Sequence, residues 1–464
     1  MNNILRLLRL LAAIIPVDGE KQSEIRNPKL NRLAGLLLSW FSDNARDLPW
    51  RRTRDPYAIW VSEIMLQQTQ VKTVIPYWER WMRELPTIEA VAKASPDKIH
   101  KLWEGLGYYT RARNLQKAAR QMTGKHGGKF PENFDDVLAL PGIGRYTAGA
   151  ICSIAFNQAV PILDGNVIRV LTRIFGIFQN PKEKETNARL WKLTEELVGR
   201  AASSRLIGDP GPPWRGRNTV PCPKTTGKPA RGYARPANCS FLNQSLMELG
   251  ALVCTPRNPQ CGICPARKFC VASRENRVNE LPNLGQRPAA TARRFAAFVV
   301  ARHGRFLVRQ RPAGVVNAHL WEFPNVEIGR RLSEPKPDRP QKVKGESPTA
   351  VAVRERCGSE DPRSEPLADA ARHTLGFAPK ELQPLCTVKH SITRYRITLE
   401  AYRADFGRTS YTGPHSKQAM SGTGVTRSSE VGVWKTPAQM HELAFTAAHK
   451  KLASAATHCI LSGR

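Results

Sequence analysis

Residues 140–148 read LPGIGRYTA, and this segment joins two stretches, 134–140 and 146–156, whose apolar residues recur at helical spacing. Gly142 and Gly144 let the backbone turn tightly and bring its amide groups close to a phosphate. The segment therefore predicts a helix-hairpin-helix that contacts DNA. A Gly-x-Gly turn alone would also suit an ordinary connection between helices.

The sequence around this segment, from about residue 31 to 200, keeps helical spacing with breaks at proline and glycine and with hardly any strand-like alternation. It predicts a bundle of short helices. Residues 208–238 are rich in Pro, Gly, Arg and Lys without periodicity, which is typical of a surface insertion. Helical spacing resumes at Phe241.

Asp164 follows the hairpin in the run VPILDGNVIRVL, where it ends an apolar segment and precedes a helical one. Asp is a common N-cap residue, so a purely structural role would explain this position. Capping the helix and stabilising positive charge are compatible roles, because amide hydrogen bonds to a carboxylate favour its ionised form. We therefore expect Asp164 to be an ionised carboxylate that can stabilise positive charge.

Glu63 lies in the run WVSEIMLQQTQ, where helical geometry places Ile59, Trp60 and Leu66 beside it. A lone Glu on a helix usually faces water, but burying a carboxylate among apolar side chains is costly. Such burial raises the pKa and keeps the proton ready for a general acid.

Together, Glu63 and Asp164 suit cleavage of an N-glycosidic bond. Adenine is a poor anionic leaving group, so it must be protonated as it departs. The sugar that remains passes through an oxocarbenium-like state, which negative charge stabilises. One protonated and one ionised carboxyl group supply both needs.

Four of the ten cysteines crowd into a short region with the spacing C-x6-C-x2-C-x5-C. Four thiolates suit a 4Fe-4S cluster. A structural zinc site is the alternative, although such sites usually have two close Cys pairs a dozen or more residues apart. The predicted cluster ligands are Cys254, Cys261, Cys264 and Cys270.

The chain carries 71 Lys+Arg against 39 Asp+Glu, a net charge of +32, which predicts a polyanionic partner and first of all nucleic acid. No apolar run approaches the roughly 20 residues that span a bilayer, so we expect no membrane partner. Residues 4–15 resemble a secretory segment only superficially, and we interpret them as a helical extension. An organellar transit segment is the alternative if the source is eukaryotic.

The C-terminal part predicts a second domain of mixed α and β type. Apolar runs at 295–300 and 306–308, separated by Arg302-His-Gly-Arg, indicate a hairpin. Residues 392–402 alternate, and a helix-like segment begins near Pro437. The charged, Pro-rich residues from about 330 to 366 suit a loop.

These motifs together resemble the helix-hairpin-helix and iron-sulfur superfamily of DNA glycosylases, and within it the MutY branch of adenine DNA glycosylases. The likeness covers about residues 30–287, apart from the insertion. The segments that carry it are PWR (49–51), VSEIMLQQTQV (61–71), LWEGLGYY (102–109) and PILDGNV (161–167).

The resemblance implies that Glu63 protonates adenine and later helps to activate water, that Asp164 stabilises the oxocarbenium, and that Asn166 and Tyr146 shape the site. Gln68 and Tyr108 match residues that wedge into the duplex. In full, the DNA contacts that the resemblance implies are Arg51, Gln68, Thr69, Tyr108, Gly142, Gly144 and Arg145.

The endonuclease III branch is the nearest alternative, but it has a nucleophilic lysine where this chain has Tyr146. We therefore expect a monofunctional glycosylase without efficient lyase activity. A noncatalytic DNA-binding protein is a further alternative, against which the presence of both Glu63 and Asp164 argues. A thymine-glycol or mismatch glycosylase with lyase activity would also need the missing lysine.

The C-terminal part resembles the Nudix-like 8-oxoguanine recognition domain of the same family, most clearly at LWEFPNVE (320–327). No full Nudix catalytic box is evident, so no pyrophosphate hydrolysis is expected. The family's Phe-Ser-His motif is replaced around Ile392-Thr393-Arg394. The expected partner is double-stranded DNA with adenine opposite 8-oxoguanine or guanine.

The predicted architecture is an all-α helix-hairpin-helix glycosylase fold with a 4Fe-4S cluster, followed by an α+β Nudix-like domain. We expect a monomer, located in the bacterial cytoplasm near the nucleoid or in a eukaryotic nucleus or mitochondrion. The predicted parts are an N-terminal extension (1–29), a helical domain (30–273) that includes the insertion (208–238), a linker (274–291) and a lesion-recognition domain (292–464).

Overall fold

The computed structural model describes residues 28–203, 238–286, 288–328, 364–392, 394–405 and 432–461. Nearly all of the predicted N-terminal extension and of the 208–238 insertion, with Cys222, lies outside these ranges, as does most of the expected 330–366 loop. Contacts between residues divide the chain into two compact units. The first comprises Met1–Lys93 and Asn114–Arg287, and the second Ala94–Arg113 and Pro288–Arg464.

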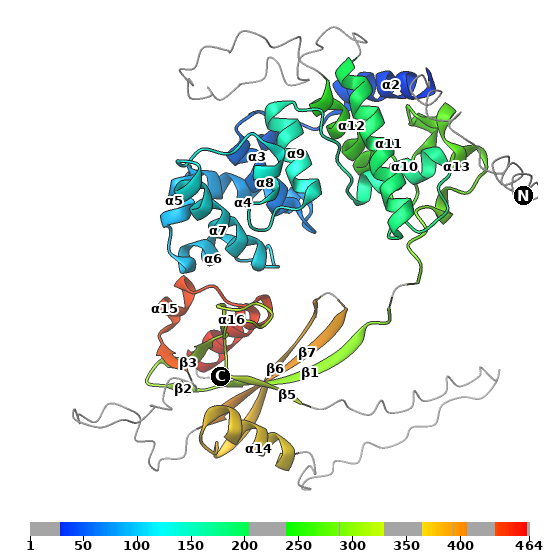
Figure 1. Cartoon of the computed structure of the whole chain (residues 1–464). Helices are drawn as coiled ribbons and strands as arrows, with labels where there is room; N and C mark the ends of the chain where they lie inside the picture. The colour runs from blue at the N-terminus through cyan, green and yellow to red at the C-terminus, as the bar shows by residue number, and fades with distance from the viewer. Residues whose placement is uncertain are drawn as a thin grey trace, which may run out of the picture. The chain divides into compact units, whose positions relative to one another are not determined.

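The described part of the first unit is helical, as expected (Figure 1). Its elements are α2 (Pro28–Asn44), η2 (Pro49–Arg51), α3 (Pro56–Leu66), α4 (Val71–Glu84), α5 (Ile88–Lys93), α8 (Phe134–Leu138), α9 (Arg145–Phe156), α10 (Gly165–Phe175), α11 (Lys184–Ser203), α12 (Cys239–Leu252), η3 (Cys261–Ile263), η4 (Arg267–Phe269), α13 (Val271–Arg274) and η5 (Val278–Glu280). Helix α6 (Pro96–Trp103) falls in the second unit, and α7 (Thr110–Lys125) crosses the division. No helix in the described residues is both long and apolar enough to cross a bilayer.

The main core of the first unit lies between α2, α10, α11 and α12. Leu37, Val170 and Leu246, one from each of three of these helices, are all fully buried in it. Their close packing fixes α10 against α12, and both of these helices contribute side chains to the site described below.

Helix α3 is buried around its whole circumference, because every residue from Tyr57 to Met65 is buried. Pro56 occupies the first turn, and the Asp55 carboxylate caps the helix by accepting a hydrogen bond from the Tyr57 amide at 3.0 Å. A helix that is apolar on all sides belongs inside a protein. Glu63 is therefore carried into the interior by its neighbours.

The predicted hairpin joins α8 to α9, and Gly142 adopts the left-handed conformation with φ +80°. A Cβ atom at Gly142 would lie 2.6 Å from the Cβ of Asn114, so the turn has no room for a side chain. Gly144 precedes the first turn of α9. The helix-hairpin-helix expected from the sequence is confirmed.

The second unit holds two small sheets, besides α6. Its elements after residue 288 are β1 (Thr291–Val299), β2 (Ala301–Arg302), β3 (Arg305–Gln310), β4 (Trp321–Glu322), β5 (Asn325–Ile328), α14 (Ser364–Leu375), β6 (Glu381–Ile392), β7 (Tyr395–Asp405), β8 (Val433–Lys435), α15 (Pro437–Glu442) and α16 (Ala447–Leu461). The larger sheet has the order β5-β1-β7-β6, and the smaller one joins β2, β3 and β4, with β8 paired to β3.

The larger sheet is covered on both faces (Figure 1). Ala296 and Phe298 of β1 pack in one cluster with Ala371 of α14. The alternate residues, of which Ala297 is one, pack in a second cluster with Leu452 of α16. This α+β architecture agrees with the sequence expectation.

The predicted hairpin is confirmed at its turn, where β2 pairs with β3 and the Leu307 amide donates to the Val300 carbonyl at 3.0 Å. Two features of the strands differ from the expected ones. Strand β1 itself pairs in parallel with β7, Phe295 opposite Leu399. The alternating run 392–402 is not a single strand, because β6 ends at Ile392 and β7 begins at Tyr395. Parallel pairing joins strands about a hundred residues apart, which local patterns do not reveal.

Gly250 of α12 offers a test of how closely α10 and α12 must approach. A Cβ there would lie 2.6 Å from the Cβ and 3.1 Å from the backbone oxygen of Asn166. We expect Gly250→Ala to lower the free energy of unfolding by about 1–3 kcal/mol in urea titrations, in spite of alanine's better helix propensity. Gly35→Ala in α2, where a Cβ meets open space, is the control and should raise it by about 0.5–1 kcal/mol. An increase in the free energy of unfolding of both variants would contradict a tight contact between Gly250 and Asn166.

Candidate active site

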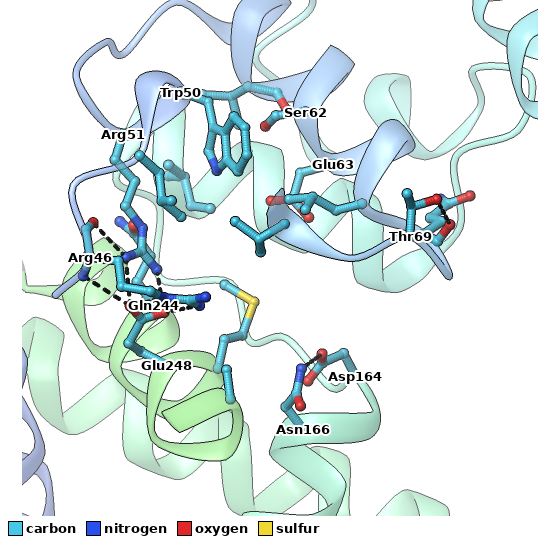
Figure 2. A pocket seen from close by; sticks show the side chains of 18 of the residues that line it. Arg46, Trp50, Arg51, Ser62, Glu63, Thr69, Asp164, Asn166, Gln244 and Glu248 are labelled. Atoms are coloured by element: carbon cyan, nitrogen blue, oxygen red, sulfur yellow. Dashed lines mark hydrogen bonds and ion pairs between the residues drawn. The ribbon is translucent and has the colours of Figure 1, made fainter. Parts of the chain in front are cut away.

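A pocket in the first unit brings together residues from α3, α9, α10 and α12 (Figure 2). Its volume is about 510 Å³, within the range of small-molecule sites. The residues that line it are Arg46, Leu48, Trp50, Arg51, Ile59, Ser62, Glu63, Leu66, Gln67, Gln68, Thr69, Val71, Tyr146, Ile154, Asp164, Gly165, Asn166, Gln244, Met247, Glu248 and Ala251. All four predicted catalytic residues are among them.

Glu63 is 6% exposed and points into this pocket from α3. The Tyr146 hydroxyl, from the first turn of α9, donates a hydrogen bond to its Oε2 at 2.9 Å. The same hydroxyl lies 3.4 Å from Sδ of Met247 on α12.

Burial, with a smaller contribution from the negative charge of Asp164, raises the pKa of Glu63 to about 7. The Tyr146 hydrogen bond and the positive charge of Arg51 act in the opposite direction and are outweighed. A large fraction of Glu63 is therefore protonated near neutral pH, as a general acid requires. Burial also raises the pKa of Tyr146 well above its usual value, so the phenol keeps its proton.

Asp164 is the N-cap of α10, where its Oδ1 accepts a hydrogen bond from the Val167 amide at 2.8 Å. The Asn166 side-chain amide donates to Oδ2, also at 2.8 Å. Burial raises the pKa of Asp164, while these hydrogen bonds and the charge of Arg169 lower it. The hydrogen bonds expected from the sequence are present, but they do not fully offset the increase in the pKa of Asp164 that burial causes.

Arg169 supports this arrangement from the next turn of α10. Its guanidinium donates to Oδ1 of Asn166 at 2.8 Å, to the carbonyl of Gly250 at 2.8 Å and to the carbonyl of Cys254 at 2.7 Å. A chain of hydrogen bonds therefore runs from the Asp164 carboxylate to the backbone of the first predicted cluster ligand.

A second buried carboxylate, Glu248 of α12, was not predicted. It accepts hydrogen bonds from the guanidinium groups of Arg46 and Arg51 at 2.7–3.0 Å and is 1% exposed. The two arginines outweigh burial and hold the pKa of Glu248 at about 2. An acidic residue inside the apolar run SFLNQSLMELGAL is the same signal that identified Glu63, so the sequence contained it.

Arg51 is buried in an ion pair, whereas its predicted DNA contact would suggest an exposed side chain. Its side chain is 8% exposed, pairs with Glu248 and lies over the Phe41 ring at 5.4 Å. These contacts make it part of the pocket wall. Its contact with DNA stays a prediction.

Two of the predicted duplex contacts have strained backbones. Gln68 has φ +56° and Tyr108 has φ +48°, and both side chains are exposed. Non-glycine residues seldom adopt this conformation, and such strain is frequent at functional sites. Gln68 and Thr69 line the pocket, whereas Tyr108 is not among its described lining residues.

The exposed Arg145 follows the hairpin glycines, and its guanidinium lies 3.9 Å from the centre of the Trp191 ring. This cation–π contact orients the guanidinium at the start of α9. The exposure of Arg145 and its fixed orientation both suit the predicted phosphate contact.

The four predicted ligand cysteines line one small cavity beside α10 and α12, and none of them forms a disulfide. Arg173, which is 1% exposed, donates to Sγ of Cys254 at 3.3 Å and to the carbonyl of Thr255 at 2.8 Å. A guanidinium at this position would stabilise thiolates. Cys239 is buried at the start of α12 and is not among the residues that line this cavity. Within the described ranges, no three His, Cys, Asp or Glu side chains are grouped as a single-ion site.

Two sequence models match the chain. Residues 61–196 match that of the HhH-GPD superfamily base excision DNA repair proteins, and residues 296–455 match that of the NUDIX domain.

Similar curated proteins carry the name adenine DNA glycosylase. The rat protein is 38% identical over 344 residues, which are 63% of this chain and 60% of the rat protein. The human protein is 37% identical, over 63% of this chain and 57% of its own length. The protein of Buchnera aphidicola from Schizaphis graminum is 34% identical over 293 residues, 63% of this chain and 74% of that protein. The chain thus spans less than two thirds of these mammalian relatives and about three quarters of the bacterial one.

The raised pKa of Glu63 predicts that this residue destabilises the fold at neutral pH. Between the usual value of 4.5 and about 7, the folded protein keeps a proton that the unfolded chain releases, so stability falls as pH rises through this window. Glu63→Gln should therefore raise the free energy of unfolding at about pH 8, by on the order of 1–3 kcal/mol, and leave it nearly unchanged at about pH 4.

The control for this comparison is Glu280→Gln, which removes an exposed carboxylate. It should show no such gain at the higher pH. Equal stability of Glu63→Gln and the parent protein at both pH values would mean that the carboxyl group of Glu63 titrates normally.

Proposed function

This chain belongs to the adenine DNA glycosylase family, and from that premise we propose that it hydrolyses the N-glycosidic bond of adenine in DNA. The observation that carries the proposal is the pair of carboxyl groups in one pocket, with Glu63 protonatable near neutral pH and Asp164 held by hydrogen bonds. Adenine inside a stacked duplex is inaccessible, so the nucleotide must rotate into the pocket. The volume of the pocket is ample for a purine.

In the proposed mechanism, Glu63 donates its proton to the adenine ring as the bond to the sugar breaks. Asp164 stabilises the positive charge that develops on the sugar, while Asn166 and Tyr146 hold the two carboxyl groups in place. The ionised Glu63 then accepts a proton from the attacking water. Glu63 is neutral when it acts as the acid and ionised when it acts as the base, and Asp164 is ionised when it stabilises the sugar.

The pocket wall supplies fixed polar groups for an extruded base. The buried Glu248 pairs with Arg46 and Arg51, and these ion pairs fix the geometry of the three side chains. Ordered charges of this kind need no rearrangement when a base enters. We therefore infer that this side of the pocket helps to select adenine.

Tyr146 also bears on the class of glycosylase. A lyase of the related branch needs an amine at this position, and the phenol of Tyr146 has no amine with which to form a Schiff base. We infer a monofunctional enzyme. A DNA-binding protein without chemistry would have no need of a buried, protonatable Glu63, which makes that alternative weaker.

We infer that duplex DNA binds through the hairpin at Gly142 and Gly144, with Arg145 on a phosphate and with Gln68 and Tyr108 beside the lesion. The net charge of +32 supports this partner. Thr69, next to Gln68 at the pocket, suits the same role.

We propose that the base opposite adenine is 8-oxoguanine or guanine and that the second unit reads it. Support comes from the NUDIX-domain match and from the turn between β6 and β7, where Arg394 donates to the Tyr395 hydroxyl at 3.0 Å. Thr393, which lies between Ile392 and Arg394 in the sequence, is outside the described residues. An arginine in this turn suits a phosphate as well as a base edge.

We propose that a 4Fe-4S cluster is held by Cys254, Cys261, Cys264 and Cys270. The residues fit it, because four unpaired thiols surround one cavity and Arg173 supplies positive charge beside Cys254. Bound there, the cluster would order the loop that follows α12, and it has no part in the proton transfers above.

Activity on defined duplexes tests the proposed reaction. The protein should remove adenine opposite 8-oxoguanine and opposite guanine under single-turnover conditions, and should leave an oxidised pyrimidine intact. Glu63→Gln should slow adenine removal by about 10²–10⁴-fold or more while duplex binding persists, because the amide cannot donate the proton. Glu280→Gln is the control and should cleave normally. Excision of the oxidised pyrimidine alone would overturn the substrate assignment.

Iron analysis tests the cluster. Anaerobically prepared protein should be brown and contain about four irons per chain. Cys261→Ser should lose iron or folded protein, because a ligand contributes to both, whereas Cys386→Ser of the second unit should keep its iron. Stoichiometric zinc without iron in the parent protein would refute the proposal.

A further inference from the structure

The hydroxyl group of Tyr146 lies between two acceptors. It is 2.9 Å from Oε2 of Glu63 and 3.4 Å from Sδ of Met247, and it has one proton to give. It can therefore donate to only one of these atoms at a time. Its own oxygen can meanwhile accept a hydrogen bond.

The charge of Glu63 decides which acceptor is used. When Glu63 is ionised, its oxygen attracts the hydroxyl proton of Tyr146. When Glu63 carries its proton on Oε2, that O–H is a donor and the Tyr146 oxygen accepts from it, so the hydroxyl proton of Tyr146 turns to another acceptor. The thioether of Met247 is within hydrogen-bond range of a sulfur acceptor.

Resting on the proposed function, we propose that Met247 is a positioning residue, whose sulfur accepts the Tyr146 hydroxyl proton whenever Glu63 holds the catalytic proton. The hydrogen-bond order is then Glu63 O–H to Tyr146 oxygen, and Tyr146 O–H to Met247 sulfur. When Glu63 gives its proton to the base, the hydroxyl turns to the carboxylate that is left. No proton leaves Tyr146 in either state.

This arrangement would favour both charge states of Glu63 in turn. Before a base enters the pocket it holds the proton of Glu63, and after the proton has left it stabilises the carboxylate, with only the rotation of one O–H bond. The raised pKa of Tyr146 agrees with a phenol that keeps its proton throughout.

Simple packing is the alternative role of Met247, since its side chain also contacts the core between α2, α10 and α12. A leucine of similar volume would serve that role equally well. The two roles therefore differ in what Met247→Leu does to Glu63.

Other charged groups also face Glu63 and must stay constant in the comparison. They are Asp164 at the start of α10, Arg51 of η2, and Glu248 of α12 with its partner Arg46. Among the described residues, the Met247 sulfur forms a hydrogen bond with Tyr146 and with none of these charged groups, so Met247→Leu leaves their hydrogen bonds intact.

Infrared difference spectroscopy can follow the carboxylic acid C=O band of Glu63 during a pH titration of the whole protein, with Glu63→Gln spectra subtracted. Met247→Leu removes an acceptor that only the protonated form uses, so the pKa of Glu63 should fall by roughly half a unit to one unit. The matched control is Met122→Leu, a buried methionine of α7 that does not line the pocket. It should leave the pKa unchanged.

Tyr146→Phe completes a double-mutant cycle. Without the hydroxyl, Met247→Leu should no longer change the pKa of Glu63. An unchanged pKa in Met247→Leu, an equal change in Met122→Leu, or the same change with and without the Tyr146 hydroxyl would each overturn the proposal. Because the titration needs no DNA, it is independent of whether adenine is the substrate, and a loss of adenine excision alone would count against the proposed function instead.

Discussion

The burial of one carboxyl group is the constraint on which the rest of this site depends. Helix α3 is apolar on all sides, so folding carries Glu63 away from water and raises its pKa to about 7. A hydrogen bond from the Tyr146 hydroxyl of α9 partly offsets the effect of this burial on the pKa. The same burial that lowers the stability of the fold also makes Glu63 an acid that titrates near neutral pH.

Helix α12 joins this carboxyl group to the other parts of the site. Three of its residues, and Cys254 just after its end, meet five partners from other parts of the first unit. Met247 meets Tyr146, Glu248 meets Arg46 and Arg51, Gly250 lets Asn166 approach, and Cys254 accepts from Arg169. The pocket and the proposed cluster loop therefore share one rigid helix. A change in the loop can reach Asp164 through Arg169 and Asn166.

The sequence predicted those parts of the site that have a local pattern. Gly142 and Gly144 identified the hairpin because a tight turn requires glycine, and Glu63 stood out as an acid among apolar neighbours. Glu248 has the same pattern and was overlooked. Arg46 and Met247 could not be found in this way, because they meet their partners across about two hundred and one hundred residues of chain. The parallel pairing of β1 with β7 was missed for the same reason.

The most direct measurement of the central claim is the rate of adenine excision as a function of pH, in single turnovers with enzyme in excess. A protonated Glu63 that acts while Asp164 is ionised predicts a bell-shaped profile, with the rate falling as pH rises through about 7. The alkaline fall should report the loss of one proton. A rate that stays constant or increases from about pH 7 to about pH 9 would contradict the account, because it would mean that excision does not need the proton on Glu63.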